Sequence, residues 1–393
     1  MNYLVATDRY FGDAPGGQFG IAWELARAAS SAGHRAALLC GSFDGDPPAG
    51  RSEVDGVEIV RYRIPDRAGW KLSRFAEHAG AAASAFRDHL TGTCWDTVHA
   101  HSLVTGSLLG TRLPGRRTVY TAHSPATLEQ SVNWSGPGPG NRLRRALGLP
   151  MVRRTEARAL QGAAVVHVLS RFTEQALAEI HGDWVMGRVS RIPWWSASRR
   201  PMLSPEEARR RVGWPTGIPV VFTLRRLVPR MGLDTFVDAL ARLAPDRPFL
   251  AVIGGEGPER TALESRSADL VSRGKVRFAG RLSDEERDLA YRAADLFVVP
   301  TRALECFGMI VVEALAQGCP VISSRAGALP EIMDSALPGW TFEPGNVEGL
   351  AALLARVIGG DLVSPPRERL AEWANANYGQ AKIWPAYEEL ITG

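Results

Sequence analysis

The sequence predicts an α/β fold built from two doubly wound parallel sheets. Short apolar runs rich in Val, Ile and Leu alternate with longer segments whose apolar residues recur at helical spacing. Continuously apolar strands are typical of parallel sheets that helices cover on both faces. The alternation runs twice, and 393 residues are long for a single core. We therefore expect two Rossmann-like domains.

Eleven apolar runs predict strands. The first half contains, in order, YLVATD, RAALLC, VEIVRY, TVHAH, RTVYTAHS and AVVHVLS. The second half contains PVVFTL, FLAVIG, VRFAG, LFVVPT and PVISS. Helical patterns such as GIAWELARAASSAGH and GLDTFVDALARLA lie between them. Strand and helix thus alternate throughout both halves.

The alternation breaks between Ile192 and Pro219, where prolines and a charged helical stretch replace the strands. We predict a linker near Ser196–Pro201, so that one domain spans 1–198 and the next 199–365. The segment WANANYGQAKIWPAYEELI predicts a broken helix. We expect residues 366–393 to form a C-terminal helix that packs back on the N-terminal domain.

Composition excludes several classes of protein. The formal net charge of +4 is too small to indicate a nucleic-acid partner without clustering. The four cysteines form no close pair and no metal-ligand spacing with histidines, which fits a reducing compartment. The N-terminus lacks the pattern of a signal peptide, and no run reaches the length of a membrane span. We expect a cytoplasmic protein with no metal site.

Glycines follow the first predicted strand, in DRYFGDAPGGQFG. Gly16 and Gly17 open the next helix, where free N–H groups favour an anion such as a diphosphate. The spacing differs from the G-x-G-x-x-G pattern of nicotinamide enzymes. A plain tight turn is the alternative interpretation.

Two loops in the second half also directly follow predicted strands. RRLVPRMG places Arg225, Arg226 and Arg230 at a strand end, and the planar guanidinium suits phosphate. A solvated basic loop is the alternative. The glycine-rich turn GGEGPER follows the next strand and is weak evidence by itself.

Two carboxylates flank a helix start in LECFGMIVVEALAQG. Gly308 is expected to begin the helix, with Glu305 in the preceding loop and Glu313 inside it. A helix separates groups eight residues apart by about 12 Å, comparable to the span from ribose to sugar in a nucleotide-sugar. Each carboxylate can accept hydroxyl hydrogens, and the helix N-terminus favours a diphosphate. Alternatively, Glu305 favours the helix start and Glu313 is solvated.

These motifs occur together in an order that resembles a known family. The ordered set is PGG and AGH near the N-terminus, RRLVPRMG, GGEGPER, KVRFAGRLSDEE, the two glutamates around Phe307-Gly308, and GCPVISSRAGALPEIM. It resembles the retaining glycosyltransferases of family 4, which have the GT-B fold. The resemblance covers most of the chain and is densest from Val220 to Pro344.

The resemblance implies a role for each matched residue. Glu305 would bind hydroxyls of the donor hexose, Glu313 would hold the ribose, and Arg226 would neutralise the leaving diphosphate. His123 matches the histidine near the reacting sugar, and a core or turn histidine satisfied by backbone is the alternative. The remaining donor-side positions are Gly16, Gly17, Arg225, Arg230, Arg281, Leu282, Phe307, Gly308 and Met309.

The sequence departs from the family pattern in two places. The family's lysine five residues after the phosphate arginine is Met231 here, so Arg225 or Arg230 would have to supply the charge. The usual Asn-Gly-Val-Asp after the last strand of the first domain is replaced by WWSA at 194–197. These changes concern phosphate binding and the hinge between the domains.

Two further features are open to two interpretations. Trp134 lies in a Gly/Pro-rich loop after His123, which is either an acceptor lid or a simple connection. The basic stretch RLRRALGLPMVRR, residues 142–154, either contacts an anionic membrane or acidic acceptor or forms a solvated helix face.

The resemblance implies a metal-independent, retaining hexosyltransferase without a cofactor, since the nucleoside-diphosphate sugar is a co-substrate. Domain 1–198 would bind the acceptor and domain 199–365 the donor. We expect UDP-glucose or UDP-N-acetylglucosamine first and GDP-mannose second, with a small soluble acceptor, as in secondary metabolism. The alternatives are a nucleotide-sugar epimerase of the same fold and a non-catalytic sugar-nucleotide-binding protein. A pyridoxal-phosphate phosphorylase would need Lys275 or Lys382, and neither has a suitable context.

Overall fold

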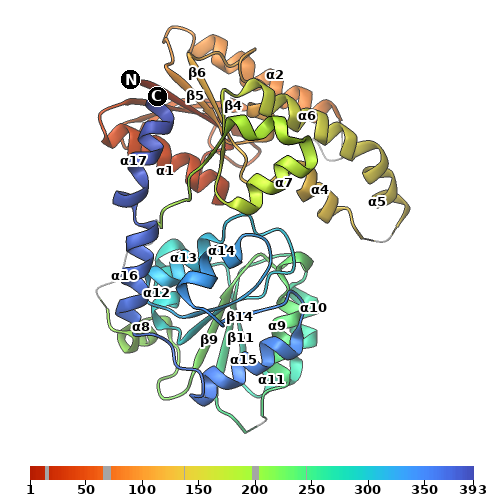
Figure 1. Cartoon of the computed structure of the whole chain (residues 1–393), viewed down its shortest axis with the longest axis vertical. Helices are drawn as coiled ribbons and strands as arrows, with labels where there is room; N and C mark the ends of the chain where they lie inside the picture. Colours follow the sequence, from red (N-terminus) through yellow and green to blue (C-terminus); the bar gives the residue numbers. More distant parts are fainter. Residues whose placement is uncertain (14–16, 65–71, 137, 197–202, 245) are drawn as a thin grey trace. The chain divides into compact units, whose positions relative to one another are not determined.

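The computed structural model describes residues 1–13, 17–64, 72–136, 138–196, 203–244 and 246–393. Contacts divide them into two compact units, Met1–Pro193 with Trp384–Gly393, and Trp194–Ile383. Each unit contains one sheet of mainly parallel strands with helices packed against it (Figure 1). The predicted fold of two Rossmann-like parallel-sheet domains is therefore confirmed.

The first unit is built on an eight-stranded sheet in the order β3-β4-β2-β1-β5-β6-β7-β8. Its strands are β1 (Asn2–Arg9), β2 (Arg35–Ser42), β3 (Gly50–Val54), β4 (Val57–Arg63), β5 (Thr97–Ala100), β6 (Arg117–Thr121), β7 (Val165–Val168) and β8 (Val189–Arg191). Only the edge pair β3–β4 is antiparallel among these strands. The parallel strands have their carboxyl ends at one edge, where the loops of interest begin.

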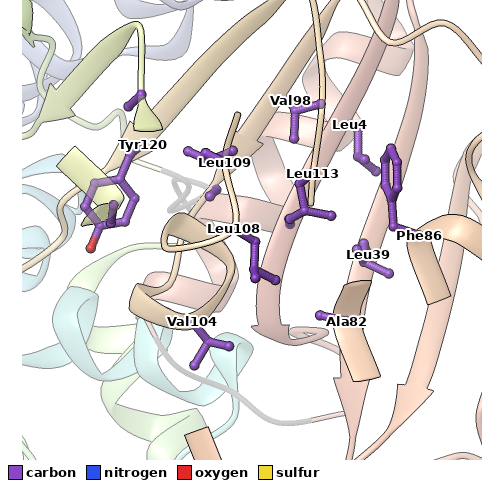
Figure 2. Packing of buried hydrophobic residues seen from close by; sticks show 14 of the residues in the cluster. Leu4, Leu39, Ala82, Phe86, Val98, Val104, Leu108, Leu109, Leu113 and Tyr120 are labelled. Atoms are coloured by element: carbon purple, nitrogen blue, oxygen red, sulfur yellow. The ribbon is translucent and has the colours of Figure 1, made fainter. Parts of the chain in front are cut away.

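Helices cover both faces of this sheet. They are α1 (Gly17–Ser31), α2 (Leu72–His89), α3 (Leu103–Gly106), α4 (Ala126–Asn133), α5 (Pro139–Leu143), η1 (Arg144–Gly148), α6 (Leu149–Gly162), α7 (Arg171–His181) and η2 (Asp183–Arg188). On one face Leu4 and Val98 pack with Ala82 and Phe86 of α2 (Figure 2). On the other, strand residues such as Tyr3 pack with α1. Alternate residues of β1 thus enter two different cores.

The second unit is built on a six-stranded sheet in the order β11-β10-β9-β12-β13-β14. Its strands are β9 (Val220–Leu224), β10 (Leu250–Gly254), β11 (Val276–Gly280), β12 (Leu296–Val299), β13 (Val321–Ser324) and β14 (Thr341–Phe342). All five pairings among them are parallel. The two central strands, β9 and β12, are neighbours, so the loops that follow them start side by side.

Helices of the second unit pack in pairs, α8 with α12, α9 with α15 and α13 with α16. They are α8 (Pro205–Val212), η3 (Pro229–Met231), α9 (Leu233–Ala241), α10 (Arg260–Arg266), α11 (Ala268–Ser272), α12 (Asp284–Ala293), α13 (Met309–Ala316), α14 (Leu329–Ala336), α15 (Val347–Gly359) and α16 (Arg367–Tyr378). Ser204 and Ser283 begin α8 and α12 with capping boxes.

The C-terminal segment divides between the two units. The predicted break in the C-terminal helix is present between α16 and α17 (Gln380–Thr392). We expected all of 366–393 to pack on the first domain, but α16 groups with the second unit and Trp384–Gly393 groups with the first. Those last residues lie within α17, whose Ile391 carbonyl accepts a hydrogen bond from Thr97 Oγ1 at 2.7 Å. The domain border predicted at 198/199 lies outside the described residues, and the contacts change at Pro193/Trp194.

Candidate functional site

Main-chain hydrogen bonds join three loops at the carboxyl ends of β9, β10 and β11. Arg225 N donates to Gly254 O at 3.1 Å, and Gly255 N donates to Gly280 O at 2.6 Å. Gly255 has φ +111°, and a Cβ there would lie 1.9 Å from Arg225 O. Glycine at position 255 therefore allows the backbone of the arginine loop to lie directly against the backbone of the turn after β10.

Arg225 and Glu305 form a buried ion pair between the loops after β9 and β12. The Arg225 guanidinium pairs with the Glu305 carboxylate and also donates to Thr301 Oγ1 at 2.5 Å. The two side chains are 7% and 17% exposed, so solvent screens this pair weakly. Glu305 is thereby held in place in the loop after β12, and the family resemblance assigns this residue to the hexose.

Backbone geometry holds Glu305 from the other side. Ala328 N donates to Glu305 O at 2.7 Å. Gly327 has φ +58°, and a Cβ there would lie 2.2 Å from that same oxygen. Leu304 also has φ +61°, which is costly for a residue with a side chain. Strain concentrated beside one carboxylate is typical of functional sites.

Gly308 begins α13 with φ +98°, as predicted. Phe307 is buried, and its ring meets that of Tyr378 edge-on at 5.9 Å. Met309 is the first residue of the helix. The donor-side positions Phe307, Gly308 and Met309 that the resemblance implies therefore lie at the N-terminal end of an eight-residue helix, whose first N–H groups have no partner within the helix.

Glu313 lies inside α13 and is 7% exposed. Its Oε2 accepts a hydrogen bond from Tyr291 Oη at 3.2 Å and lies 3.8 Å from Arg287 Nε. Burial raises the pKa of Glu313, and the positive charge of Arg287 opposes that rise. The Glu313 carboxylate is therefore held in one position by Tyr291 and Arg287. The alternative prediction of a solvated Glu313 is wrong.

Sequence reasoning missed Arg287 and Tyr291. They lie four residues apart on α12, on the same side of that helix, and both meet Glu313. This i,i+4 spacing of an arginine and a tyrosine was the available signal. It was obscured because the segment DEERDLAYRA reads as an ordinary charged surface helix.

The three arginines after β9 differ in their surroundings. Arg225 is engaged by Glu305, whereas the exposed Arg226 side chain has no ion pair or hydrogen bond within the described ranges. Arg230 Nη1 donates to Leu304 O at 3.2 Å, which places its guanidinium over the loop that carries Glu305. Met231, at the position of the family's lysine, is 8% exposed and packs inward.

Two further donor-side positions lie after β11. Arg281 is exposed, and Leu282 is half-buried. A Cβ on Gly254 would lie 3.5 Å from Leu282 Cδ1, so this leucine lies beside the loop after β10. The WWSA departure also has a structural role, because Trp194 and Trp195 stack at 3.8 Å and are almost fully buried.

A chain of hydrogen bonds crosses the sheet of the first unit. Tyr3 Oη lies 2.8 Å from His99 Nδ1, and His99 Nε2 lies 2.6 Å from Thr121 Oγ1. Thr121 Oγ1 lies 2.9 Å from His167 Nδ1, and His167 Nε2 lies 3.0 Å from Ile192 O. The chain links β1, β5, β6, β7 and the residue after β8.

The direction of this chain is fixed by its last acceptor. A carbonyl only accepts, so His167 carries its hydrogen on Nε2 and accepts from the Thr121 hydroxyl on Nδ1. Thr121 must then accept from His99 Nε2–H, and His99 Nδ1 accepts from Tyr3. Every polar group in the chain is satisfied while both imidazoles are neutral.

His123 lies next to this chain. Its Nε2 is 3.0 Å from His101 Nδ1, and the His101 and His99 rings are 4.2 Å apart. Burial lowers the pKa of His123 to about 3 and that of His167 to about 4. His123 is therefore a neutral, buried side chain whose tautomer is coupled to His101. Its hydrogen bond is to a side chain, which differs from the alternative of a core or turn histidine satisfied by backbone.

The other predicted positions of the first unit are less informative. Gly17 is the first residue of α1, and Gly16 lies outside the described residues. Trp134 ends α4 and is 8% exposed. A buried indole favours packing over sugar stacking, so the structure gives no support to Trp134 as a stacking platform.

The buried imidazoles predict acid sensitivity of the first unit. Histidines are protonated in the unfolded chain below about pH 6.5, whereas His167 stays neutral in the fold down to about pH 4. Between these two pH values the unfolded state binds more protons than the folded state. The free energy of unfolding therefore decreases as the pH is lowered, by about 1.4 kcal/mol per pH unit for each such histidine. Urea unfolding between pH 7 and 5 should show this slope.

The matched variants for this experiment are His167→Asn and His89→Asn. His89 is exposed at the end of α2, so its loss should leave the slope unchanged. His167→Asn should lower stability at pH 7 but give a shallower pH dependence. Equal slopes in the wild type and His167→Asn would contradict the account.

The described residues contain neither a cluster of metal-ligating side chains nor a membrane-spanning helix. No group of three or more His, Cys, Asp or Glu side chains is arranged there to hold a metal ion. No helix in the same residues combines the length and the apolar composition of a bilayer span.

Two Rossmann-like units, with the loops after β9 and β12 joined through an arginine–glutamate pair, fit the GT-B fold that the sequence resemblance implies. Comparison with family models agrees. Residues 16–195 match the glycosyl transferase 4-like domain, and residues 204–377 match glycosyl transferases group 1. The chain therefore belongs to the GT-B glycosyltransferases of the family 4 type.

Curated relatives include enzymes with different acceptors. The chain is 29% identical over 323 residues to the GDP-mannose-dependent α-(1-6)-phosphatidylinositol monomannoside mannosyltransferase of Mycolicibacterium smegmatis, covering 78% of each protein. It is also 29% identical to the D-inositol 3-phosphate glycosyltransferase of Corynebacterium efficiens, over 61% of this chain. That match spans 57% of the relative's length.

Solved structures share the fold at low sequence identity. Sucrose-phosphate synthase from Thermosynechococcus elongatus aligns with a TM-score of 0.79 and 21% identity, over 99% of this chain and 98% of that one. WaaG, a glycosyltransferase involved in lipopolysaccharide biosynthesis, aligns with a TM-score of 0.75 and 20% identity over the whole of both chains.

Proposed function

We propose that the protein is a retaining hexosyltransferase that moves a sugar from a nucleoside-diphosphate donor to an acceptor hydroxyl. The observation that carries the proposal is the arrangement around α13. Glu305 is fixed before the helix, Glu313 is buried within it, and the side chain of Arg226 is exposed after the neighbouring β9. Two carboxylates for hydroxyls and one guanidinium for phosphate match the parts of a nucleotide-sugar.

In this proposal catalysis is positioning plus electrostatic stabilisation. The bond between the sugar C1 and the diphosphate oxygen breaks, and the acceptor oxygen bonds to C1 on the same face. The acceptor proton passes to a phosphate oxygen of the leaving group. Arg226 stabilises the developing charge, and Arg230 supplies the second cation in place of the lysine replaced by Met231. Glu305 orients the hexose and is not a nucleophile.

The family resemblance assigns His123 of the first unit to the reacting sugar. A neutral imidazole can donate one hydrogen bond and accept another. Its partner His101 selects which nitrogen of His123 carries the hydrogen, since their shared bond needs one donor and one acceptor. Gly17, at the start of α1, is assigned to close approach of the diphosphate.

The donor and acceptor are assigned by class. The donor is a hexose linked to uridine or guanosine diphosphate, and the GDP-mannose in a relative's name brings that nucleotide alongside the UDP-sugars first expected. The acceptor hydroxyl belongs to a small polyol, either free or as a lipid headgroup. Relatives of both kinds are named for their acceptors, inositol 3-phosphate and phosphatidylinositol monomannoside.

The test combines UDP-glucose, UDP-N-acetylglucosamine and GDP-mannose with free polyols, inositol phosphate and vesicles containing phosphatidylinositol. The expected result is one donor that yields a glycoside with the donor's anomeric configuration, seen by NMR. Turnover should persist in EDTA, because Arg226, Arg230 and the start of α13 supply the positive charge. Free sugar from donor alone would indicate an epimerase. Donor binding without any turnover would indicate a non-catalytic protein.

Glu313→Gln is expected to weaken binding of donor and free nucleoside diphosphate alike, because both contain the ribose. Losing charge-assisted hydrogen bonds costs about 1.5–3 kcal/mol, or roughly ten- to hundredfold in Kd. The fold should survive, since Arg287 keeps Asp284 and Asp288 as partners at 2.8 and 3.0 Å. Calorimetric titration measures both affinities.

Tyr291→Phe is the matched control for that titration. It removes only the hydroxyl that donates to Glu313, so a loss nearer 1 kcal/mol is expected. A folded Glu313→Gln protein with unchanged affinity for the diphosphate would show that Glu313 does not hold the ribose.

A further inference from the structure

A continuous helical segment of the first unit carries an exposed apolar stripe. The segment runs through α5, η1 and α6, from Pro139 to Gly162. Leu143, Leu147 and Met151 follow one another at intervals of four residues and are 60%, 68% and 40% exposed. Three of the seven exposed large apolar side chains among the described residues thus share one side of one helix.

Exposed arginines flank this stripe. They are Arg142, Arg144, Arg145, Arg153 and Arg154. No ion pair involves any of them in the part of the chain that the structure describes. The sequence has no Asp or Glu between Glu129 and Glu156. A helix with an apolar stripe and only positive charge beside it is therefore presented to solvent.

The C-terminal part of the same helical segment is buried in the first unit, whereas the N-terminal part is exposed to solvent. Glu156 is fully buried and accepts hydrogen bonds from Thr127 N at 3.1 Å and Thr127 Oγ1 at 2.6 Å. Ala159 and Leu160 enter the core of the first unit. The helix is thus anchored at its C-terminal end, and its α5 end extends away from the first sheet (Figure 1).

We propose that residues 139–154 form a docking surface for an anionic lipid bilayer. Leu143, Leu147 and Met151 would enter the headgroup boundary, and the arginines would contact lipid phosphates. Charge complementarity favours this occupant over a second copy of the chain, because the same basic stripe on two copies would repel. The surface stands independently of the glycosyltransferase proposal, since none of its residues belongs to the candidate site.

The interaction has two separable parts. Each arginine near an anionic bilayer contributes roughly fivefold to the partition coefficient, and the contribution falls as salt rises. A buried leucine contributes roughly tenfold. Together they give reversible binding that depends on both the charge of the lipid and the apolar stripe.

The experiment is sedimentation of the full chain with vesicles of phosphatidylcholine alone or mixed equally with phosphatidylglycerol. The variants are Arg144→Ala/Arg145→Ala and Leu147→Gln. Arg210→Ala/Arg211→Ala on α8 removes equal charge from another exposed helix. Val363→Gln removes an apolar side chain that is 80% exposed elsewhere. These two controls separate the surface from bulk charge and bulk hydropathy.

The wild type is expected to sediment with anionic vesicles and much less with phosphatidylcholine. Arg144→Ala/Arg145→Ala should bind about 25-fold more weakly and Leu147→Gln about tenfold more weakly. The controls should change binding less than about twofold. Equal binding to both vesicles, or equal losses in variants and controls, would overturn the proposal. So would self-association without vesicle binding, abolished by Leu147→Gln in analytical ultracentrifugation.

Discussion

Arg226→Ala is expected to lower kcat by about 10²–10³-fold, by analogy with the loss of one preorganised donor. The buried Met231 leaves no lysine to share the charge of the leaving diphosphate, and Arg225 is committed to Glu305. Charge on the leaving group grows mainly in the transition state, so KM should change much less than kcat. Steady-state kinetics with the best donor of the panel measures both.

Arg230→Ala is the informative comparison for that experiment. Its side chain donates to the Leu304 carbonyl and lies on the same loop, so a smaller loss in kcat is expected. Arg210→Ala on α8 controls for general loss of positive charge. If Arg226→Ala left kcat nearly unchanged and Arg230→Ala lowered it strongly, Arg230 would be the main residue that stabilises the leaving diphosphate.

Glu305→Ala is expected to abolish transfer and to destabilise the second unit by about 3 kcal/mol or more. Its removal leaves the Arg225 guanidinium buried without its carboxylate, and Arg225 Nε already lacks a partner within the described residues. Breaking a buried pair costs more than removing both of its charges. Denaturant unfolding measures the loss of stability.

Adding Arg225→Met to Glu305→Ala separates stability from activity. The double variant should recover most of the lost free energy of unfolding, because no unpaired charge remains. It should stay inactive, because the contact with the hexose is still missing. Asp238→Ala breaks the exposed pair with Arg266 and should cost less than about 1 kcal/mol. A double variant no more stable than Glu305→Ala would show that the pair is not coupled.

The regular part of the fold was predictable because it depends on local patterns. All eleven apolar runs appear as strands, and most of them are buried at nearly every position. The three missed strands are β3, β8 and β14. GRSEV in β3 is polar because it is an exposed edge strand, and β8 and β14 have only three and two residues. Neither feature produces an apolar run.

The candidate site was predictable only in part. Positions at strand ends and the glycines of close approach follow from sequence, as Gly255 and Gly308 show. The sequence does not show that Arg225, and not Arg226, pairs with Glu305. These two adjacent arginines are the same residue type and differ only in the direction in which their side chains point. The contacts of Glu313 likewise depend on how α12 packs against α13. Tertiary packing decided these points.

The most direct test is calorimetric binding of UDP-glucose, UDP-N-acetylglucosamine and GDP-mannose to the wild type and to Glu313→Gln. One of these donors is expected to bind at one site per chain and to compete with its own nucleoside diphosphate. Glu313→Gln is expected to weaken binding of the donor and of the diphosphate by the same factor. A folded wild-type chain that binds none of the three donors or their diphosphates would contradict a nucleotide-sugar site in the second unit.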